Sequence, residues 1–305
     1  MRFFVTGVGG QLGHDVMNEL NSRGFSGIGS DIAPAYSGVQ DGTAVTRMPY
    51  VSLDITDRAA VEKTITEVSP DVVVHCAAWT AVDAAEDEEN IPKVYAINAA
   101  GTRNVAESCA KIGCKMIYIS TDYVFDGQGD APWEPDCKDY SPLNAYGRSK
   151  LEGEKAVAQL LEKYFIVRTA WVFGKNGHNF IRTMLRVGKS HDSIRVVSDQ
   201  IGTPTYTLDL ARLLVDMART EAYGYYHATN EGGFISWYDF ACEIFRQAGY
   251  PTQVIPVTTT EYGASKAVRP GNSRLSKEKL IKTGFIPLPT WQNALERYLR
   301  EIEVI

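Results

Sequence analysis

The first 170 residues alternate between short apolar runs and longer segments in which apolar residues recur every three or four positions. Short apolar runs predict strands that are buried on both faces, and the longer period predicts helices that pack against them. We expect strands over 2–7, 25–31, 71–78, 115–121 and 164–174, and helices over 11–24, 57–70, 91–113 and 141–163. This alternation predicts parallel strands with right-handed crossovers, which is a doubly wound α/β sheet.

The pattern becomes looser after residue 175. Helices are expected over 179–188, 237–249 and 290–302, and short strands over 194–198 and 224–229. This half predicts a smaller α/β cap on the carboxyl edge of the sheet. We expect one domain over 1–171 and a second over 172–305, although later segments can return to the first. Long loops are expected at 33–52 and 127–140.

Composition and charge exclude several classes of protein. The formal net charge is −6 and no basic run is present, so we expect no nucleic-acid surface. No apolar run approaches membrane-spanning length, and the first residues lack the apolar stretch of a signal peptide. The five cysteines form no C-x-x-C pair, which predicts reduced thiols in a cytoplasmic protein.

The segment TGVGGQLG, residues 6–13, lies between the first expected strand and the first expected helix. Gly7, Gly10 and Gly13 give the backbone the freedom that a tight turn needs, and they let a pyrophosphate approach closely. The N-terminus of the helix then offers free N–H groups to the anion. A glycine turn without a ligand is the alternative, but this context favours a dinucleotide and a Rossmann-type fold.

Asp31 ends the second expected strand, about 20 residues beyond the glycines. A carboxylate there can accept hydrogen bonds from the adenosine ribose and repels a 2′-phosphate. The residue therefore favours NADH slightly over NADPH. Arg47, in the expected 33–52 loop, could reach back and change that preference.

AYGRSK, residues 145–150, places Tyr146 and Lys150 four positions apart, on one face of a helix expected to start at Ser141-Pro142. A phenol beside a fixed cation ionises more easily. Thr121 ends the preceding strand, at the sheet edge where ligands bind. The three side chains could converge on a carbonyl that a nicotinamide reduces, as proton donor, cation and polarising hydroxyl.

Several stretches resemble known families. TGVGGQLG, HCAAWTAVDAAE, STDYVFDG and the Tyr146/Lys150 pair resemble the extended short-chain dehydrogenase/reductases. Within these, STDYVFDG, SPLNAYGRSKLEGE, RTAWVFG, DQIGTPT and RPGNSRL resemble the dTDP-4-dehydrorhamnose reductase family, over nearly the whole chain. The resemblance implies reduction of the C4 carbonyl of dTDP-4-dehydro-L-rhamnose to dTDP-L-rhamnose by NADH or NADPH.

The resemblance also implies roles for individual residues. Tyr146 would give its proton to the sugar carbonyl, Lys150 would hold the nicotinamide ribose and lower the pKa of the tyrosine, and Thr121 would bond the same carbonyl oxygen. Asp122 and Trp171 would flank the sugar. The implied cofactor contacts are Gly7, Gly10, Gln11, Leu12, Gly13, Asp31, Asp54, Ile55, Ala77, Ala78, Thr80, Tyr146 and Lys150, with Asn98 as support behind them.

Three features leave alternatives open. Arg269, beside Pro270-Gly271, suits a phosphate or nucleotide contact, but it could be a surface residue. Trp171 could belong to the core instead of the sugar site. Residues 86–89 are four consecutive carboxylates that we interpret as a solvated face, because neighbours on a helix point in different directions.

The metal and the oligomeric state are open as well. Some members of the resembled family form a magnesium-linked dimer through a glutamate in the first helix, where this chain has Asp15 nearby. The remaining ligands are not matched, so Mg²⁺ and a homodimer are both uncertain. A regulatory module that resembles the beta subunit of methionine adenosyltransferase is an alternative to an enzyme, and so is a reductase or epimerase of another nucleotide sugar.

Overall fold

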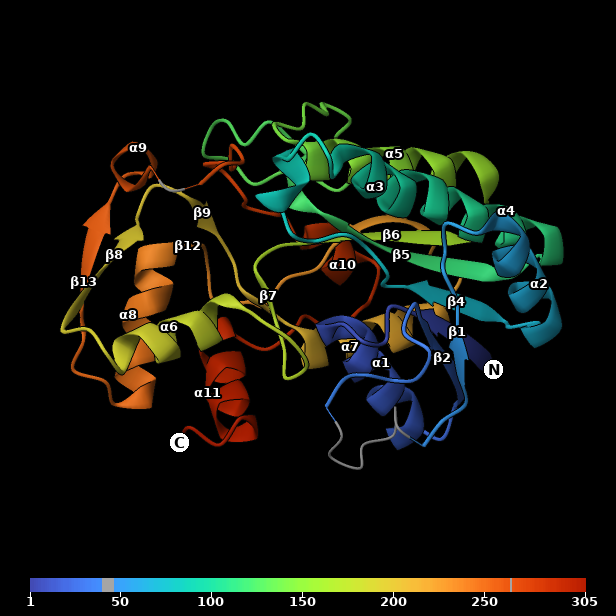
Figure 1. Ribbon diagram of the computed structural model, residues 1–305, viewed down its shortest axis with the longest axis horizontal. Coiled ribbons are helices and arrows are strands. Elements are labelled where there is room, and N and C mark those ends of the chain that lie inside the picture. Colours follow the sequence, from blue (N-terminus) through green and yellow to red (C-terminus); the bar gives the residue numbers. More distant parts are fainter. Residues whose placement is uncertain (40–46, 264) are drawn as a thin grey trace.

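The computed structural model describes residues 1–39, 47–263 and 265–305, and these form a larger and a smaller lobe (Figure 1). The described part of the larger lobe holds a seven-stranded sheet in the order β11-β6-β5-β4-β1-β2-β3, with every neighbouring pair parallel. Its strands are β1 Arg2–Thr6, β2 Ser26–Asp31, β3 Tyr50–Ser52, β4 Val72–His75, β5 Lys115–Thr121, β6 Tyr164–Thr169 and β11 Gly224–His227. The predicted doubly wound sheet is confirmed.

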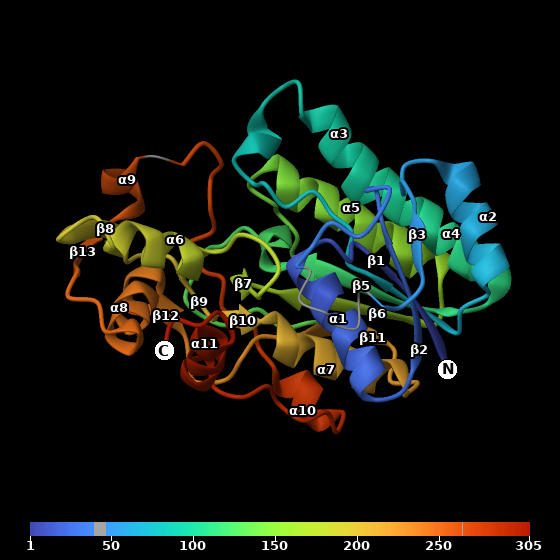
Figure 2. The same ribbon diagram turned by 60° about the horizontal axis from the view of Figure 1, so that its bottom comes forward.

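Helices cover both faces of this sheet (Figure 2). One face carries α1 (Gln11–Ser22), α7 (Thr207–Ala218) and the short α10 (Glu278–Lys282), and the other carries α2 (Arg58–Val68), α4 (Thr102–Ile112) and α5 (Ala145–Leu160). Strand β1 contributes side chains to the cores on both faces of the sheet. Phe3 and Val5 belong to the core with α1 and α7, whereas Phe4 belongs to the core with α2 and α4. Alternate side chains of a strand point to opposite faces, so a continuous apolar run supplies both cores.

The smaller lobe has its own apolar core. It contains helices α6 (Phe180–Gly188), α8 (Trp237–Ala248), α9 (Thr259–Tyr262) and α11 (Trp291–Glu301), and the strand pairs β8 (Ser193–Val197) with β13 (Gln253–Val257), β7 (Val172–Phe173) with β10 (Thr205–Tyr206), and β9 (Ile201–Gly202) with β12 (Ile235–Ser236). Helix α7 packs against the large sheet, and strand β11 is its edge strand beside β6. The chain therefore crosses between the lobes several times after residue 171.

Three segments differ from the sequence predictions in their bounds. The predicted helix start at Ser141-Pro142 is wrong: α5 begins at Ala145, because Asn144 caps it by accepting the Gly147 N–H at 2.8 Å. The strand expected over 164–174 is interrupted at Trp171, whose φ is +51°. The expected 33–52 loop contains β3, and its residues 40–46 lie outside the described residues.

The helix expected over 91–113 is continuous but irregular. It consists of α3 (Ile91–Tyr95), a π-helical turn over Ala96–Gly101, and α4, and it ends at Gly113 as predicted, with φ +71°. Two short 3₁₀ turns, Ala84–Glu86 and Asp122–Val124, follow strands β4 and β5. Both lie beside the carboxyl edge of the sheet.

Candidate active site

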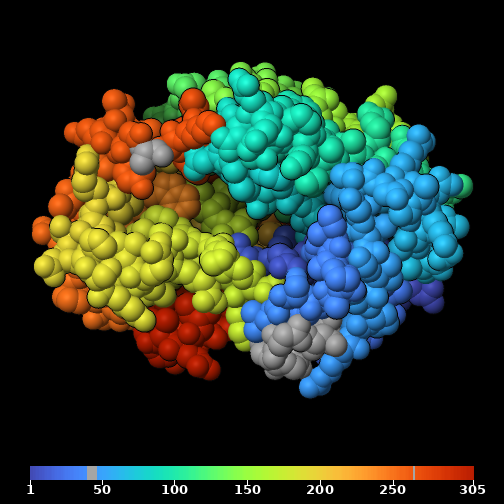
Figure 3. All heavy atoms as spheres, in the orientation of Figure 1, coloured from blue at the N-terminus to red at the C-terminus, as the bar shows by residue number. Residues whose placement is uncertain are grey.

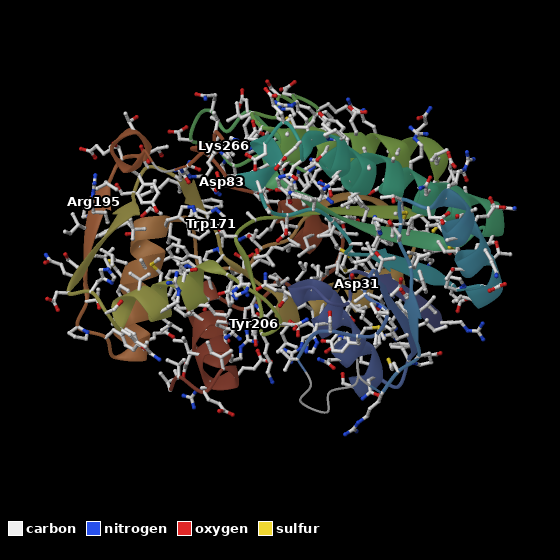
Figure 4. The ribbon with its side chains drawn as sticks, viewed as in Figure 1. Asp31, Asp83, Trp171, Arg195, Tyr206 and Lys266 are labelled. Atoms are coloured by element: carbon white, nitrogen blue, oxygen red, sulfur yellow. The ribbon has the colours of Figure 1, made fainter. Side chains whose placement is uncertain are left out.

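A cavity of about 910 Å³ opens between the two lobes, at the carboxyl edge of the sheet (Figure 3). It runs from the end of β2, where Asp31 lies, to the smaller lobe, where Trp171 lies (Figure 4). The predicted residues that line it are Gly7, Gly10, Gln11, Leu12, Gly13, Asp31, Asp54, Ile55, Ala77, Ala78, Thr80, Thr121, Asp122, Tyr146, Lys150, Trp171 and Arg269. The fold thus brings together residues from widely separated parts of the sequence.

Asn98 is the predicted residue outside this lining. It is fully buried in the π-helical turn. Its Oδ1 accepts the N–H of Trp79 at 2.8 Å, and its Nδ2 donates to the carbonyl of Trp79 at 3.1 Å and to Ser149 Oγ at 3.0 Å. Asn98 therefore ties the segment after β4 to helix α5 from behind the cavity.

The glycine turn is shaped as a close approach requires. Gly7 has φ +73°, and a Cβ there would lie 2.5 Å from the backbone nitrogen of Ala77. A Cβ on Gly13 would lie 2.3 Å from the carbonyl oxygen of Gly7. Helix α1 follows directly, and its first N–H groups have no carbonyl partner within the helix. This cradle fits a pyrophosphate.

The smaller lobe holds this turn in place through contacts that the sequence did not predict. Asn176 Nδ2 donates to the carbonyl oxygens of Gly9 at 3.0 Å and Gly10 at 3.4 Å. The side-chain oxygen of Gln11 accepts the Gly174 N–H at 2.8 Å and Asn179 Nδ2 at 3.0 Å. The dinucleotide cradle is therefore completed by residues beyond strand β6.

Asp31 lies at the adenosine end of such a cradle. Its Oδ2 accepts the Gly9 N–H and its Oδ1 accepts the Ile32 N–H, both at 2.8 Å. The neighbouring Ser30 is buried and lines the cavity, and its Oγ has no hydrogen-bond partner among the described residues. An unpartnered hydroxyl beside a carboxylate fits the polar edge of a ribose, so the residues present fit a dinucleotide.

Thr121, Tyr146 and Lys150 all line the cavity. Burial raises the pKa of Tyr146 above its ordinary value, and a hydrogen bond with Thr121 partly opposes this. Burial lowers the pKa of Lys150 to about 7, against the opposing charge of Glu154. Lys150 Nζ lies 4.1 Å from the ring centroid of Tyr118. The net shift of the Tyr146 pKa is upward because burial of the phenol dominates, and the lowering expected from Lys150 stays a prediction.

Asp122 is a buried carboxyl group next to these three residues. Burial raises its pKa to about 6, although hydrogen bonds from Ser273 and Thr121 oppose the shift. Thr121 Oγ1 donates to Asp122 Oδ1 at 3.0 Å, whereas Asp122 Oδ2 has no partner among the described residues. Ser120 Oγ is buried, unpartnered and cavity-lining in the same way. Such atoms are rarely left unpaired in proteins, which indicates a polar ligand here.

The side of the cavity in the smaller lobe is aromatic. Trp171 stacks on Trp237, the first residue of α8, which also lines the cavity. Trp237 was not predicted from the sequence. The segment SWYD does indicate where this helix starts, because Ser236 and Asp239 form a capping box, and the helix start fixes the position of its first side chain, Trp237.

Arg269 reaches the cavity from the C-terminal segment. Its guanidinium donates to Asp83 Oδ2 at 2.7 Å, Ser265 Oγ at 2.9 Å and Tyr123 Oη at 3.2 Å. Its side chain is 30% exposed, and it borders the cavity. The position of Arg269 at the cavity therefore favours the predicted phosphate or nucleotide contact over the alternative of a surface residue.

The acidic residues considered for metal binding have other partners. Asp15 is buried in α1 and accepts a hydrogen bond from Thr207 Oγ1 at 2.5 Å. Glu86 accepts the Ala145 N–H at 2.6 Å, and Asp87 pairs with Lys266, so residues 86–89 are not simply a solvated face. Within residues 1–39, 47–263 and 265–305, no group of three or more metal-ligating side chains is present.

None of the helices in the described ranges has the length and apolar character needed to cross a membrane. The five cysteines are all free thiols.

Comparison with known proteins places this cavity in a family. The chain matches the family described as RmlD substrate binding domain over residues 1–304. It is 40% identical to a dTDP-4-dehydrorhamnose reductase of Streptomyces griseus over 96% of this chain and 91% of that protein. A crystal structure of a dTDP-4-dehydrorhamnose reductase from Clostridium acetobutylicum is 40% identical, with a TM-score of 0.89 over 99% of this chain and 100% of that one.

A second solved structure carries a ligand. The dTDP-4-dehydrorhamnose reductase of Bacillus anthracis, in complex with NADP, is 39% identical, with a TM-score of 0.88 over 98% of this chain and 99% of that one. The match covers the glycine turn, the central residues and the smaller lobe alike. The chain belongs to the RmlD substrate-binding family, the family of the dTDP-4-dehydrorhamnose reductases.

Proposed function

We propose that this protein reduces the C4 carbonyl of dTDP-4-dehydro-L-rhamnose to give dTDP-L-rhamnose, with NADH or NADPH as the reductant. The observation that carries the proposal is that Thr121, Tyr146 and Lys150 line one cavity together with the glycine turn. The names of the relatives support the choice of substrate. The intact set of Thr121, Tyr146 and Lys150 favours an enzyme over a regulatory binding module.

The nicotinamide supplies the hydride when it is bound. The residues of this chain supply the remaining chemistry: Tyr146 gives its proton to the carbonyl oxygen, and the hydroxyl of Thr121 turns from Asp122 to donate its hydrogen bond to the same oxygen. The raised pKa of Tyr146 keeps the phenol protonated at neutral pH, which suits a proton donor. Lys150, whose pKa burial lowers to about 7, holds the ribose and restores the proton to Tyr146.

The smaller lobe and the loops above the sheet bind the nucleotide sugar. Asp122 accepts a sugar hydroxyl through its unpartnered Oδ2, and the indole of Trp171 lies against the apolar face of the sugar. Arg269 contacts the diphosphate, because a guanidinium matches two phosphate oxygens. At the other end of the cavity, Ser30 and Asp31 bind the adenosine ribose.

The choice between the two cofactors is a separate proposal. Asp31 favours NADH by its charge, although both of its oxygens already accept backbone N–H groups. Arg47 is exposed and follows directly on residues outside the described ranges. We expect activity with both cofactors and a modest preference for NADH.

We further infer a cytoplasmic location, which the free thiols support. A homodimer stays a prediction, which measurement of the molecular mass in solution tests.

The test is to incubate the purified protein with dTDP-4-dehydro-L-rhamnose and either reduced cofactor, and to follow the absorbance of the cofactor and the sugar product. Oxidation of the cofactor that depends on the sugar, with dTDP-L-rhamnose as product, supports the proposal. The proposal would be rejected if the protein binds the cofactor but oxidises neither NADH nor NADPH in the presence of the sugar. A parallel reaction with another 4-keto nucleotide sugar separates this substrate from its relatives.

A further inference from the structure

Asp83 joins two segments that are far apart in the sequence. We call residues 265–269 the strap, because they pass from the smaller lobe to the segment after β4. Asp83 Oδ1 accepts Ser265 Oγ and the Ala267 N–H, both at 3.0 Å, and Oδ2 accepts Arg269 Nη2 at 2.7 Å. Figure 4 shows Asp83 and Lys266 close together above Trp171. One carboxylate therefore holds both ends of the strap.

Asp83 acts from outside the cavity. Its neighbour Val82 and its partner Arg269 line the cavity, whereas Asp83 is not among the described residues that line it and has 48% of its side chain exposed. Burial alone would raise the pKa of Asp83, but the hydrogen bond from Ala267 and the charge of Arg269 lower it overall. The carboxylate is thus ionised at neutral pH, which strengthens its hydrogen bond to the guanidinium.

The hydrogen bonds of Arg269 leave a defined pair of donors. A guanidinium has five N–H groups. Nε donates one to Ser265, Nη1 donates one to Tyr123 and Nη2 donates one to Asp83. One N–H remains on each terminal nitrogen, and since Arg269 borders the cavity these are the groups available to phosphate oxygens. Holding the flexible side chain in advance reduces the entropy that binding has to overcome.

We propose that Asp83 is a positioning residue for the nucleotide sugar, which acts by holding Arg269 with its two remaining N–H groups available to the diphosphate. This inference rests on the proposed function, since it assigns the diphosphate of that substrate to Arg269. Asp83 does not touch the substrate. Its effect therefore passes entirely through Arg269, and this makes the inference testable by a pair of substitutions.

The chain offers a matched control for the test. Asp87 is an acidic residue of the same segment and pairs with Lys266 of the strap, but it makes no contact with Arg269 in the described structure. Asp83→Asn and Asp87→Asn each remove one carboxylate that contacts the strap. Only the first removes the charged partner of Arg269. Thermal melting of both variants checks that each is folded.

The measurements are the dissociation constants of dTDP and of the reduced cofactor by calorimetry, and KM and kcat for the nucleotide sugar. Asp83→Asn is expected to raise the dTDP dissociation constant and KM about tenfold, with kcat changed less than about threefold and cofactor binding unchanged. Asp87→Asn is expected to behave as the wild type. In an Arg269→Ala background, Asp83→Asn is expected to have no further effect.

Three results would overturn the inference: an unchanged dTDP dissociation constant in folded Asp83→Asn, an equal rise in Asp87→Asn, or a full additional effect in the Arg269→Ala background. The second would mean that the strap needs both acidic contacts, without a special role for Arg269. A wild-type protein that binds dTDP but does not reduce the sugar would reject the proposed function alone. The dTDP titrations would then still decide the role of Asp83.

Discussion

The indole ring of Trp171 lies on that of Trp237, with ring centroids 3.7 Å apart and 15° between their planes. Trp171 has φ +51°, a conformation that is costly for a bulky residue. The stack holds this strained residue at the point where β6 gives way to β7. A partner from the smaller lobe therefore fixes a side chain that begins in the larger lobe.

Replacing Trp237 should consequently disturb the sugar site through Trp171. We expect Trp237→Ala to raise KM for the nucleotide sugar about tenfold while the dissociation constant of the reduced cofactor stays near that of the wild type. Trp133→Phe is the control, because Trp133 stacks on Phe125 outside the cavity lining. A normal KM in folded Trp237→Ala would show that the stack is dispensable for substrate binding.

Tyr146→Phe removes one hydroxyl and nothing else. Cofactor binding should persist, and turnover should fall by roughly 10²–10⁴-fold, because the proton donor is lost. The control is Tyr140→Phe, which removes a phenol hydroxyl that bonds Arg168 and does not line the cavity. Single-turnover kinetics with both variants make the comparison. Near-normal turnover in Tyr146→Phe would remove the tyrosine from the mechanism.

Asp31→Ser should change the choice of cofactor. Loss of the charge removes repulsion of a 2′-phosphate, so the ratio of kcat/KM for NADPH to that for NADH should rise. The activity with NADH should also fall, since Asp31 Oδ2 accepts the Gly9 N–H in the glycine turn. The ratio serves as its own control for any loss of active protein. If it does not move, the preference is set elsewhere.

Asp15 should make stability depend on pH. Burial raises the pKa of Asp15 from 3.8 to about 7. The charge of Glu301 also raises this pKa, whereas the hydrogen bond from Thr207 and the charges of Lys175 and Arg212 lower it. Between about pH 4 and pH 7 the folded protein binds a proton that the unfolded chain has released. The free energy of unfolding should therefore fall as the pH rises through this window, by at most about 4 kcal/mol from this group.

Asp15→Asn keeps an acceptor for Thr207 but cannot ionise. Its stability relative to the wild type should increase as the pH rises from 4 to 8, and denaturant melts across this range measure the difference. A constant difference would mean that the carboxyl titrates near its ordinary value. If Asp15→Asn instead becomes less stable relative to the wild type as the pH rises, the predicted direction of the pH dependence is wrong.

The large sheet and the placement of the glycine turn, Thr121, Tyr146 and Lys150 were predictable, because long periodic segments and parallel topology determine them. The start of α5 was not. Ser141-Pro142 is a good local start, but the Ala145 N–H is bound by Glu86, and Asn144 is the residue that caps the helix. A contact from 59 positions away outweighed the local preference, and no local pattern reports such a contact.

The other features that the sequence did not predict also depend on contacts with distant segments. Strand β3 is three residues long and was hidden in a polar segment, and it forms only because β2 offers it an edge. The pKa of Tyr146 depends on burial, which a sequence spacing does not reveal. Two of the three partners of Arg269, Tyr123 and Asp83, lie 146 and 186 positions away in the sequence, so their arrangement required the structure.

The hydrogen bonds from Asn176 and Asn179 to the glycine turn have a consequence for recombining this protein with its relatives. A chimaera joined at residue 171 would take its phosphate cradle from one parent and the side chains that brace that cradle from the other. Exchange of the sugar specificity would then carry an unintended change in cofactor affinity. A junction placed beyond Asn179 keeps each glycine turn with its own braces, so the two specificities can be inherited separately.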